Sequence, residues 1–210
     1  MTTTDPDHWN QVYDARPETA LTWFEATPTV SLDLLARHLG PGQALIDVGG
    51  GASRLVDHLL GLGAGPLAVL DISEAALAAS RARLGEAADQ VAWMVADITT
   101  FCPDQSWWVW HDRAVFHFLT EPADRAAYLA VLDKALEPGG HAIIATFADD
   151  GPEKCSGLPV MRYAPNDLAA EIERQLPGRF KPIESHRHMH ITPKGNRQNF
   201  QFSVFQKTAG

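Results

Sequence analysis

The segment Leu45–Ser53, LIDVGGGAS, decides the fold that we expect for this chain. It starts as a short apolar run of the kind found in buried strands, and it leads into consecutive glycines. Glycines at that place let the backbone adopt positive φ and approach a ligand closely, and the N-terminus of a following helix adds a partial positive charge. The segment therefore predicts a strand, a ligand-binding turn and a helix in succession.

The spacing of these glycines differs from that of dinucleotide-binding turns. The dinucleotide pattern G-x-G-x-x-G would need a glycine three residues after Gly51, where the sequence has Arg54. An acid, Asp47, comes directly before the turn instead. A carboxylate at this place would repel a diphosphate, whereas it would attract an ammonium group such as that of a methionine moiety.

Strand and helix patterns alternate from this segment onward. Further apolar runs predict buried strands at Pro66–Asp71, Val91–Val95, Trp107–His111 and Ala142–Phe147. Apolar positions at helical spacing predict helices at 55–60, 73–84, 129–136 and 167–176. Ser73 is suited to cap the second of these helices, and Pro138-Gly139-Gly140 is expected to close the third.

This alternation implies parallel strands joined by right-handed crossovers, with helices on both faces of an open sheet. Near the end of the chain, Phe180–Ile191 and Gln198–Lys207 flank the turn signal Thr192–Asn196 and predict an antiparallel hairpin. The expected fold class is α/β, with a doubly wound, mostly parallel seven-stranded sheet and a C-terminal antiparallel hairpin. We expect a single domain over 1–210, with an N-terminal arm and helix in 1–40 and the core in 41–210.

Composition narrows the range of partners. The formal net charge is −9, with 26 acidic against 17 basic side chains, which disfavours a nucleic-acid substrate. The 2 cysteines, Cys102 and Cys155, cannot form a disulfide framework and have no metal-ligand spacing. No secretory signal and no apolar stretch of membrane-spanning length are visible in the sequence. We therefore expect a soluble cytoplasmic protein with no membrane partner.

Two further acids follow the next two expected strands. Asp71 ends the second strand, where a carboxylate can accept hydrogen bonds from both ribose hydroxyls of a nucleoside. Asp97 follows the third strand, where it could accept from an adenine amino group. The alternative is that each acid only caps a strand-to-helix turn.

Together these residues resemble class I S-adenosylmethionine-dependent methyltransferases, which carry D-x-G-x-G, an acid after the second strand, and an acid followed by an apolar residue after the third. The resemblance covers nearly the whole chain and implies a Rossmann-like methyltransferase fold with S-adenosyl-L-methionine as cofactor. It assigns the cofactor's amino-acid part to the glycines, its ribose to Asp71 and its adenine to Asp97 and Ile98. The full set of expected cofactor-binding residues is Trp9, Tyr13, Trp23, Asp47, Gly49, Gly50, Gly51, Asp71, Ile72, Asp97, Ile98 and His111.

The aromatic members of this set belong to the N-terminal segment. The stretch from His8-Trp9 to Trp23-Phe24 resembles an arm that folds over the cofactor in one methyltransferase subgroup. Aromatic faces near a sulfonium would gain cation–π attraction. Ordinary packing of an N-terminal helix is the alternative.

The segment Trp110–Leu119, WHDRAVFHFL, resembles the same subgroup, which has D-R-A or D-R-G after the fourth strand and includes thiopurine methyltransferases and small lysine methyltransferases acting on citrate synthase or elongation factor. The resemblance implies that His111 and Asp112 lie beside the sulfonium and that Arg113 lies at the substrate mouth. His117 completes the candidate catalytic set. The alternatives are a buried Asp112–Arg113 ion pair that fixes the turn and a core histidine at 117.

Two later segments are candidates for the substrate side. The loop Gly151–Val160 follows the fifth strand and carries Lys154 and Cys155, both potentially reactive. His186, His188 and His190 share one face of the expected hairpin strand. We favour a solvated face for these histidines over a substrate-side role, and we predict no metal site.

The sequence therefore predicts methyl transfer to a small-molecule nucleophile, a thiol or an amine, by in-line displacement. One alternative is a protein lysine methyltransferase. Another is a nucleotide-cofactor-binding module without catalysis, or a nucleotide-dependent oxidoreductase. The methyl acceptor and the oligomeric state are not predicted.

Overall fold

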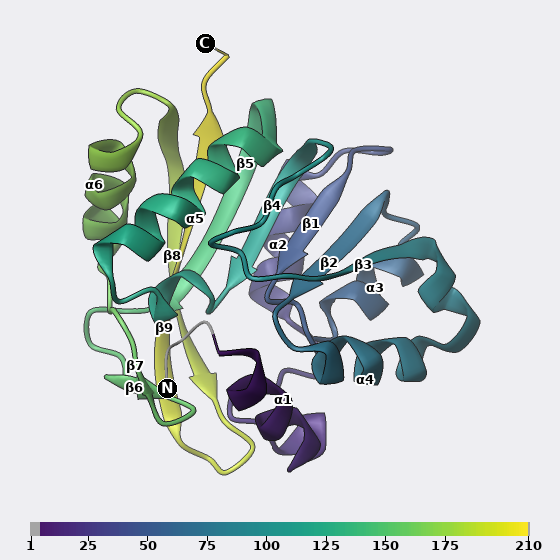
Figure 1. The fold of residues 1–210 in the computed structure, drawn as a ribbon. Coiled ribbons are helices and arrows are strands. Elements are labelled where there is room, and N and C mark those ends of the chain that lie inside the picture. The colour runs from purple at the N-terminus through teal and green to yellow at the C-terminus, as the bar shows by residue number, and fades with distance from the viewer. Residues whose placement is uncertain (1–4, 210) are drawn as a thin grey trace.

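The computed structural model describes residues 5–209, so residues 1–4 and 210 of the expected domain lie outside the described part. A 7-stranded sheet in the order β3-β2-β1-β4-β5-β9-β8 forms its centre (Figure 1). The strands are β1 Leu45–Val48, β2 Leu67–Asp71, β3 Val91–Val95, β4 Trp107–Arg113, β5 Leu136–Phe147, β8 Phe180–Ile191 and β9 Arg197–Lys207. A separate small hairpin pairs β6 Lys154–Cys155 with β7 Leu158–Pro159.

The pairing of the strands confirms the predicted fold class. β1 pairs in parallel with β2 and β4, and β4 pairs in parallel with β5. β9 is antiparallel to both β5 and β8, so the C-terminal hairpin completes an otherwise parallel sheet. The order reverses at β1, which places the carboxyl ends of β1 and β4 at the switch point where open sheets bind ligands.

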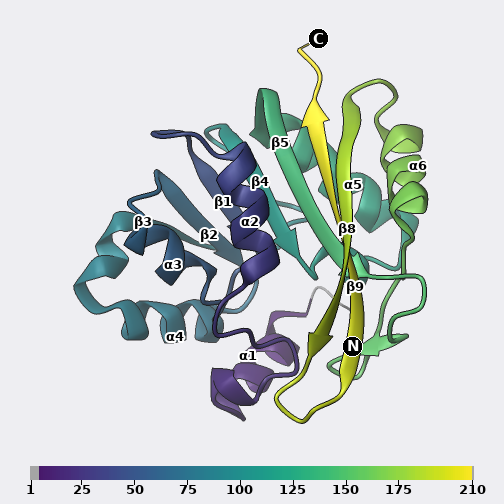
Figure 2. The ribbon, with the colours of Figure 1, turned by 180° about the vertical axis from the view of Figure 1, so that it is seen from behind.

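Helices cover both faces of this sheet (Figures 1 and 2). They are α1 Pro6–Asp14, α2 Thr29–His38, α3 Leu55–Gly61, α4 Glu74–Leu84, α5 Pro122–Ala135 and α6 Pro165–Gln175, with short 3-10 turns η1 Glu18–Ala20, η2 Gly85–Gln90 and η3 Phe116–Phe118. Ile46 and Val48 of β1 point into a core shared with α5 and α6, whereas Leu45 packs into a second core with α2 and α3. Alternating side chains of one strand therefore support both layers.

One boundary prediction was wrong. Pro138-Gly139-Gly140 does not close a helix, because α5 ends at Ala135 and β5 begins at Leu136. The chain turns within the first part of this strand, where Gly139 has a φ of 82° and a Cβ on Gly140 would lie 2.6 Å from the carbonyl oxygen of Trp108. Instead of ending a helix, the glycines let β5 come close to β4, at the point where the pairing of these two strands shifts register between Trp107 and Val109.

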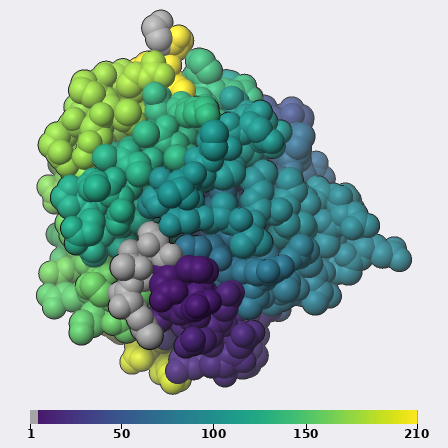
Figure 3. All heavy atoms as spheres, viewed as in Figure 1, coloured from purple at the N-terminus to yellow at the C-terminus, as the bar shows by residue number. Residues whose placement is uncertain are grey.

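The N-terminal segment lies outside these layers. α1 packs against α4 at the edge of the molecule, and Figure 3 shows it, in purple, on the surface beside the teal middle of the chain. Within residues 5–209, none of the helices has the length and apolar character needed to cross a membrane.

Candidate active site

The carboxyl ends of β1, β2 and β4 open into a hollow, which we call the large cavity; its empty space is ≈ 880 Å³ when the open solvent at its mouth is included. A second cavity, the small cavity, adjoins it and shares Tyr13, Trp23, Gly49 and Arg113 as walls. The predicted cofactor residues on the large cavity are Trp9, Tyr13, Trp23, Gly49, Asp71, Ile72, Asp97 and Ile98. Those on the small cavity alone are Asp47, Gly50 and His111. The structure thus brings nearly the whole predicted set to two joined spaces, and Gly51 lies in the turn beside them.

The glycine turn has no room for side chains. Gly49 adopts a φ of 67°, and a Cβ built there would overlap Cγ2 of Val115. Gly51 adopts a φ of 37°, and a Cβ there would lie 2.7 Å from Oδ2 of Asp71 and 2.9 Å from the Tyr13 hydroxyl. Both the backbone conformation and the close neighbours therefore require glycine at these positions.

The acids after β2 and β3 each serve the local turn and also face the large cavity. Asp71 Oδ1 accepts a hydrogen bond of 2.8 Å from the Ser73 backbone N–H. Asp97 Oδ1 accepts from the backbone and the hydroxyl of Thr99, at 2.8 and 2.7 Å. Both line the cavity, and burial raises the pKa of Asp71 to about 7. Both acids therefore hold their turns, as the alternative expected, and their place on the cavity wall leaves a ligand role open to them as well.

The N-terminal arm forms the outer wall of the large cavity. Trp9, Tyr13 and Trp23 form an aromatic group, with ring centroids of Trp23 at 6.2 Å from Trp9 and 6.1 Å from Tyr13. Asn10 attaches α1 to the start of α4, because its Oδ1 accepts from the Ser73 hydroxyl at 2.8 Å and from the Ala75 N–H at 3.2 Å. The arm is thus packed as a helix and, at the same time, covers the cavity.

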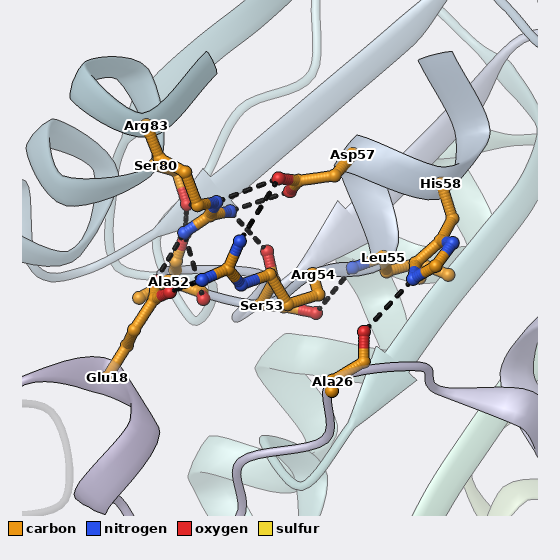
Figure 4. A network of polar contacts seen from close by, with 11 residues as sticks. Glu18, Ala26, Ala52, Ser53, Arg54, Leu55, Asp57, His58, Ser80 and Arg83 are labelled. Atoms are coloured by element: carbon orange, nitrogen blue, oxygen red, sulfur yellow. Dashed lines mark hydrogen bonds and ion pairs between the residues drawn. The ribbon is translucent and has the colours of Figure 1, made fainter. Parts of the chain in front are cut away.

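A group of ion pairs, the Glu18 clasp, ties the same arm to the core (Figure 4). Glu18 in η1 receives one hydrogen bond from Arg54 after the glycine turn and another from Arg83 in α4. Arg83 also bonds both carboxylate oxygens of Asp57 in α3, at 2.8 and 2.7 Å. The side chains of Glu18 and Arg83 are only 17% and 14% exposed, so this pair is screened less than a surface pair.

Replacing Glu18 with alanine is expected to release the arm and to speed dissociation of a nucleoside ligand several-fold. The reason is that the arm closes the cavity and that Glu18 is its link to Arg54 and Arg83, which would keep only Asp57 of the core as a shared partner. Stopped-flow tryptophan fluorescence can follow the dissociation, since Trp9 and Trp23 line the cavity. Glu153→Ala is the matched control, because the Glu153 side chain is 79% exposed in its pair with Arg162. Equal dissociation rates in both variants would show that the clasp does not hold the arm.

The side chain of His111 is fully engaged. Its Nδ1 lies 2.7 Å from Asp47 Oδ1, and its Nε2 lies 2.9 Å from the Ser31 hydroxyl. His111 lines the small cavity only. Because both ring nitrogens have partners, the geometry leaves no free nitrogen for the predicted role beside the reacting atoms.

Asp112 is turned away from both cavities. It accepts hydrogen bonds from the Val115 and Phe116 backbone N–H groups at 2.8 and 3.0 Å, and from the Tyr128 hydroxyl at 2.6 Å. Asp112 is completely buried, and burial raises its pKa to about 6. Asp112 lines neither cavity and holds the turn that follows β4, so the geometry gives no support to the expected position beside the sulfonium.

Arg113 has a different partner from the one expected. It lies 3.1 Å from Glu25 of the arm, not against Asp112, so the predicted alternative of an Asp112–Arg113 ion pair was wrong. Its Nη1 donates to the Trp23 carbonyl at 3.0 Å, and its guanidinium lies 4.8 Å from the ring centroid of Phe200. Burial lowers the pKa of Arg113. Arg113 is the one predicted catalytic residue that lines both cavities.

His117 is the core histidine that the alternative anticipated. It is completely buried, and its Nδ1 accepts a hydrogen bond of 3.2 Å from the Phe147 backbone N–H. Burial and the Arg113 charge lower its pKa to about 3, so the ring is neutral with its proton on Nε2. The lone pair is thus occupied and the ring does not line either cavity, which argues against a role as general base.

Of the two candidate residues in the loop after β5, Lys154 and Cys155, only Cys155 lines the large cavity. Cys155 is buried on the cavity wall, whereas Lys154 is exposed and lines neither cavity. Burial raises the pKa of the Cys155 thiol to about 12. A thiol of that pKa carries almost no thiolate at neutral pH, so it is a wall of the cavity and a poor nucleophile.

Thiol labelling tests this assignment. In the folded protein, a disulfide reagent is expected to modify Cys102 rapidly and Cys155 at least tenfold more slowly, because Cys102 is exposed and Cys155 is buried. Modification of the Cys102→Ser variant isolates the second thiol. Equal rates for the two thiols would contradict the buried position of Cys155.

The three histidines of β8 do not all face solvent. The side chains of His186 and His188 are 45% and 37% exposed, as expected for a solvated face, but that of His190 is 4% exposed. His190 Nδ1 lies 3.2 Å from Glu25, and its Nε2 lies 2.8 Å from the Thr22 carbonyl oxygen. The prediction was wrong for His190 because the arm packs over that end of the strand. No metal-binding group of His, Cys, Asp or Glu is found among residues 5–209.

Comparison with known proteins agrees with this architecture. Residues 45–140 match the family model described as a methyltransferase domain. No curated protein matches the sequence. A Burkholderia thailandensis 1,6-didemethyltoxoflavin-N1-methyltransferase, solved with S-adenosylhomocysteine, has 22% identity and a TM-score of 0.74, over 96% of this chain and 86% of that chain.

Two more solved structures are similar. The N-methyltransferase NodS from Bradyrhizobium japonicum has 15% identity and a TM-score of 0.69, over 96% of this chain and 99% of that chain. A structure from work on the conversion of a disulfide bond into a thioacetal group during echinomycin biosynthesis has 19% identity and a TM-score of 0.75, over 98% and 94% of the two chains. At such identities the likeness establishes the fold, which is the Rossmann-like methyltransferase fold.

Proposed function

We propose that the protein is a class I S-adenosylmethionine-dependent methyltransferase that acts on a small-molecule nucleophile, a thiol or an amine. The observation that carries this proposal is the pair of joined cavities at the switch point of the sheet. Buried acids at the ends of β1 and β2, and a third after β3, face these cavities. The match of residues 45–140 to a methyltransferase domain supports the same activity.

The residues present fit the cofactor. Asp71 and Asp97 on the large cavity suit the hydroxyls of a ribose and the amino group of an adenine, and Asp47 on the small cavity suits an ammonium. Gly49 is a wall of both cavities, and the space that a Cβ would take there is filled by the Val115 side chain. When bound, the cofactor supplies an electrophilic methyl group on a sulfonium.

The chain's own contribution is alignment and exclusion of water. Beyond Arg113, the large cavity is bounded by the rings of Phe118, Phe147 and Phe200. Apolar walls orient an acceptor and keep water from the reacting atoms. Burial raises the pKa of the Cys155 thiol on this wall to about 12, so the thiol stays protonated at neutral pH and does not serve as a base.

A transfer assay distinguishes the candidate activities. The protein is incubated with methyl-labelled S-adenosylmethionine in two separate reactions. One reaction contains a panel of thiols and amines, and the other contains cell-lysate proteins. Label in the small-molecule fraction is the expected result. A labelled protein band would favour protein lysine methylation instead, and unchanged cofactor in both fractions would contradict the proposed activity.

A further inference from the structure

A buried hydrogen-bonded chain connects Ser31, His111 and Asp47 behind the glycine turn. The Ser31 hydroxyl lies 2.9 Å from His111 Nε2, and His111 Nδ1 lies 2.7 Å from Asp47 Oδ1. All three residues line the small cavity. We propose that Ser31 and His111 are positioning residues, which fix the Asp47 carboxylate for the ammonium at the amino-acid end of the cofactor. The inference rests on the proposed function, because it assumes that this cofactor binds here.

Three different elements build the chain. Asp47 in β1 and His111 in β4 are register partners in adjacent parallel strands, so their side chains leave the sheet on the same face. Ser31 lies in the first turn of α2, which covers that face. Asp47, His111 and Ser31 are only 3%, 2% and 1% exposed. Water therefore contributes little to orienting the carboxylate, and the protein has to do so.

The direction of each hydrogen bond follows from the chemistry of the groups. A carboxylate can only accept, so His111 Nδ1 carries a proton and donates it to Asp47 Oδ1. In the neutral ring, Nε2 then accepts, and the Ser31 hydroxyl is its donor. The carboxylate thereby fixes the tautomer of the histidine, and the serine holds the ring at its other nitrogen, so that the ring in turn holds the carboxylate.

The two oxygens of Asp47 have different surroundings. Oδ1 is held by His111, whereas Oδ2 lies at the glycine turn, where a Cβ on Gly50 would be 2.5 Å from it. The hydrogen bond to Oδ1 restrains rotation of the carboxylate and favours the position of Oδ2 beside the turn. Oδ2 is then the one oxygen of Asp47 left to accept from an ammonium in the small cavity. A carboxylate that is only buried would not have one oxygen set aside for a ligand in this way.

The test compares two ligands that differ at the amino-acid end. S-adenosylhomocysteine carries the ammonium, whereas 5′-methylthioadenosine keeps the adenosine and the thioether but has no amino-acid part. In His111→Leu, affinity for S-adenosylhomocysteine is expected to fall about tenfold or more, and affinity for 5′-methylthioadenosine is expected to stay within about twofold. Ser31→Ala is expected to show a smaller loss, about threefold, in the first ligand only.

Conservative variants keep the test independent of folding. In His111→Asn, the side-chain amide can still donate to Asp47, so affinity for S-adenosylhomocysteine is expected to recover most of the loss. Ser203→Ala is the matched control, because it removes a buried hydroxyl that bonds Gln201 and lines neither cavity. Thermal unfolding identifies any variant that does not fold. If His111→Leu does not fold, the two ligands are compared in Ser31→Ala and His111→Asn instead.

The outcomes separate the two claims. Equal losses for both ligands in the folded variants, or no loss for either, would overturn the positioning role while the proposed function stands. Absence of binding of both ligands to the folded wild-type protein would overturn the proposed function and the positioning role with it. A loss confined to S-adenosylhomocysteine supports both.

Discussion

Replacing Gly49 with alanine is expected to weaken binding of S-adenosylhomocysteine by about a hundredfold or more. Gly49 has a φ of 67°, a conformation that costs an L-residue about 1–2 kcal/mol. In addition, the new methyl group would overlap the side chain of Val115, which follows β4 and also lines the large cavity. Relief of this overlap has to move the turn or Val115, and either movement changes the shape of the cavity.

Gly63→Ala is the control that separates these two costs. Gly63 has nearly the same φ, 68°, but a Cβ there would meet nothing within 4 Å. We expect Gly63→Ala to lose about 1–2 kcal/mol of unfolding free energy and to bind S-adenosylhomocysteine as the wild-type protein does. Calorimetric titration and denaturant unfolding measure the two quantities. Wild-type affinity in a folded Gly49→Ala protein would contradict a ligand position against this turn.

Replacing Asp71 with asparagine is expected to weaken binding of S-adenosylhomocysteine about tenfold or more at pH 8. The asparagine oxygen can still accept from the Ser73 N–H, so the turn after β2 is kept. What is lost is a charged acceptor for two ribose hydroxyls, which a neutral amide cannot replace. Affinities of the two proteins, measured by calorimetric titration at pH 8, check this difference. Unchanged affinity in Asp71→Asn would refute the ribose position.

The pH dependence of the wild-type protein gives a second measurement on the same residue. Burial raises the pKa of Asp71 from 3.8 to about 7 in the unliganded protein. Below pH 7 the carboxyl group is mostly protonated, so wild-type affinity is expected to fall as the pH is lowered through 7, whereas Asp71→Asn is not expected to show this step.

The effect of the raised pKa on folding stability has the opposite pH dependence. A raised pKa stabilises the fold at low pH, and this contribution is lost as the pH rises toward 7.

Thermal unfolding of the unliganded proteins checks that direction. The melting temperature of Asp71→Asn relative to wild type is expected to rise between pH 5 and pH 8, because only the wild-type residue becomes a buried charge. A difference that stays constant over this range would contradict the raised pKa.

Most of the fold could be predicted because it depends on local patterns. Apolar runs that end in glycine or acid located β1 and β2, and the turn signal at Thr192–Asn196 located the β8–β9 hairpin. One exception was the start of β5. There the sequence Pro138-Gly139-Gly140 has the composition of a helix end, but a close approach to Trp108 of the neighbouring strand determines its conformation. That contact is not encoded within the segment.

The sequence predicted which residues surround the cavities better than it predicted which side chains these residues contact. Strand ends located Asp47, Asp71 and Asp97, since parallel strands bring their carboxyl ends together. The contacts of Arg113 with Glu25 and of His111 with Ser31 join residues from distant parts of the chain, and no periodicity carries them. Such contacts depend on how the arm and α2 pack over the sheet.

Two other features of the structure could not be predicted from the sequence for the same reason. Glu18 occurs in an unremarkable stretch, and only the folded chain brings it to Arg54 and Arg83. Strand alternation correctly placed the histidines of β8 on one face, but it could not show that the arm would bury His190. Alternation gives the direction of a side chain, not what lies above it.

A calorimetric titration with S-adenosylhomocysteine, with NAD as a parallel control, tests the central claim most directly. The acid before the glycine turn and the absence of a glycine at position 54 predict micromolar binding of S-adenosylhomocysteine and no measurable binding of NAD. Binding of NAD alone, or of neither compound by the folded protein, would contradict a methyl-donor site.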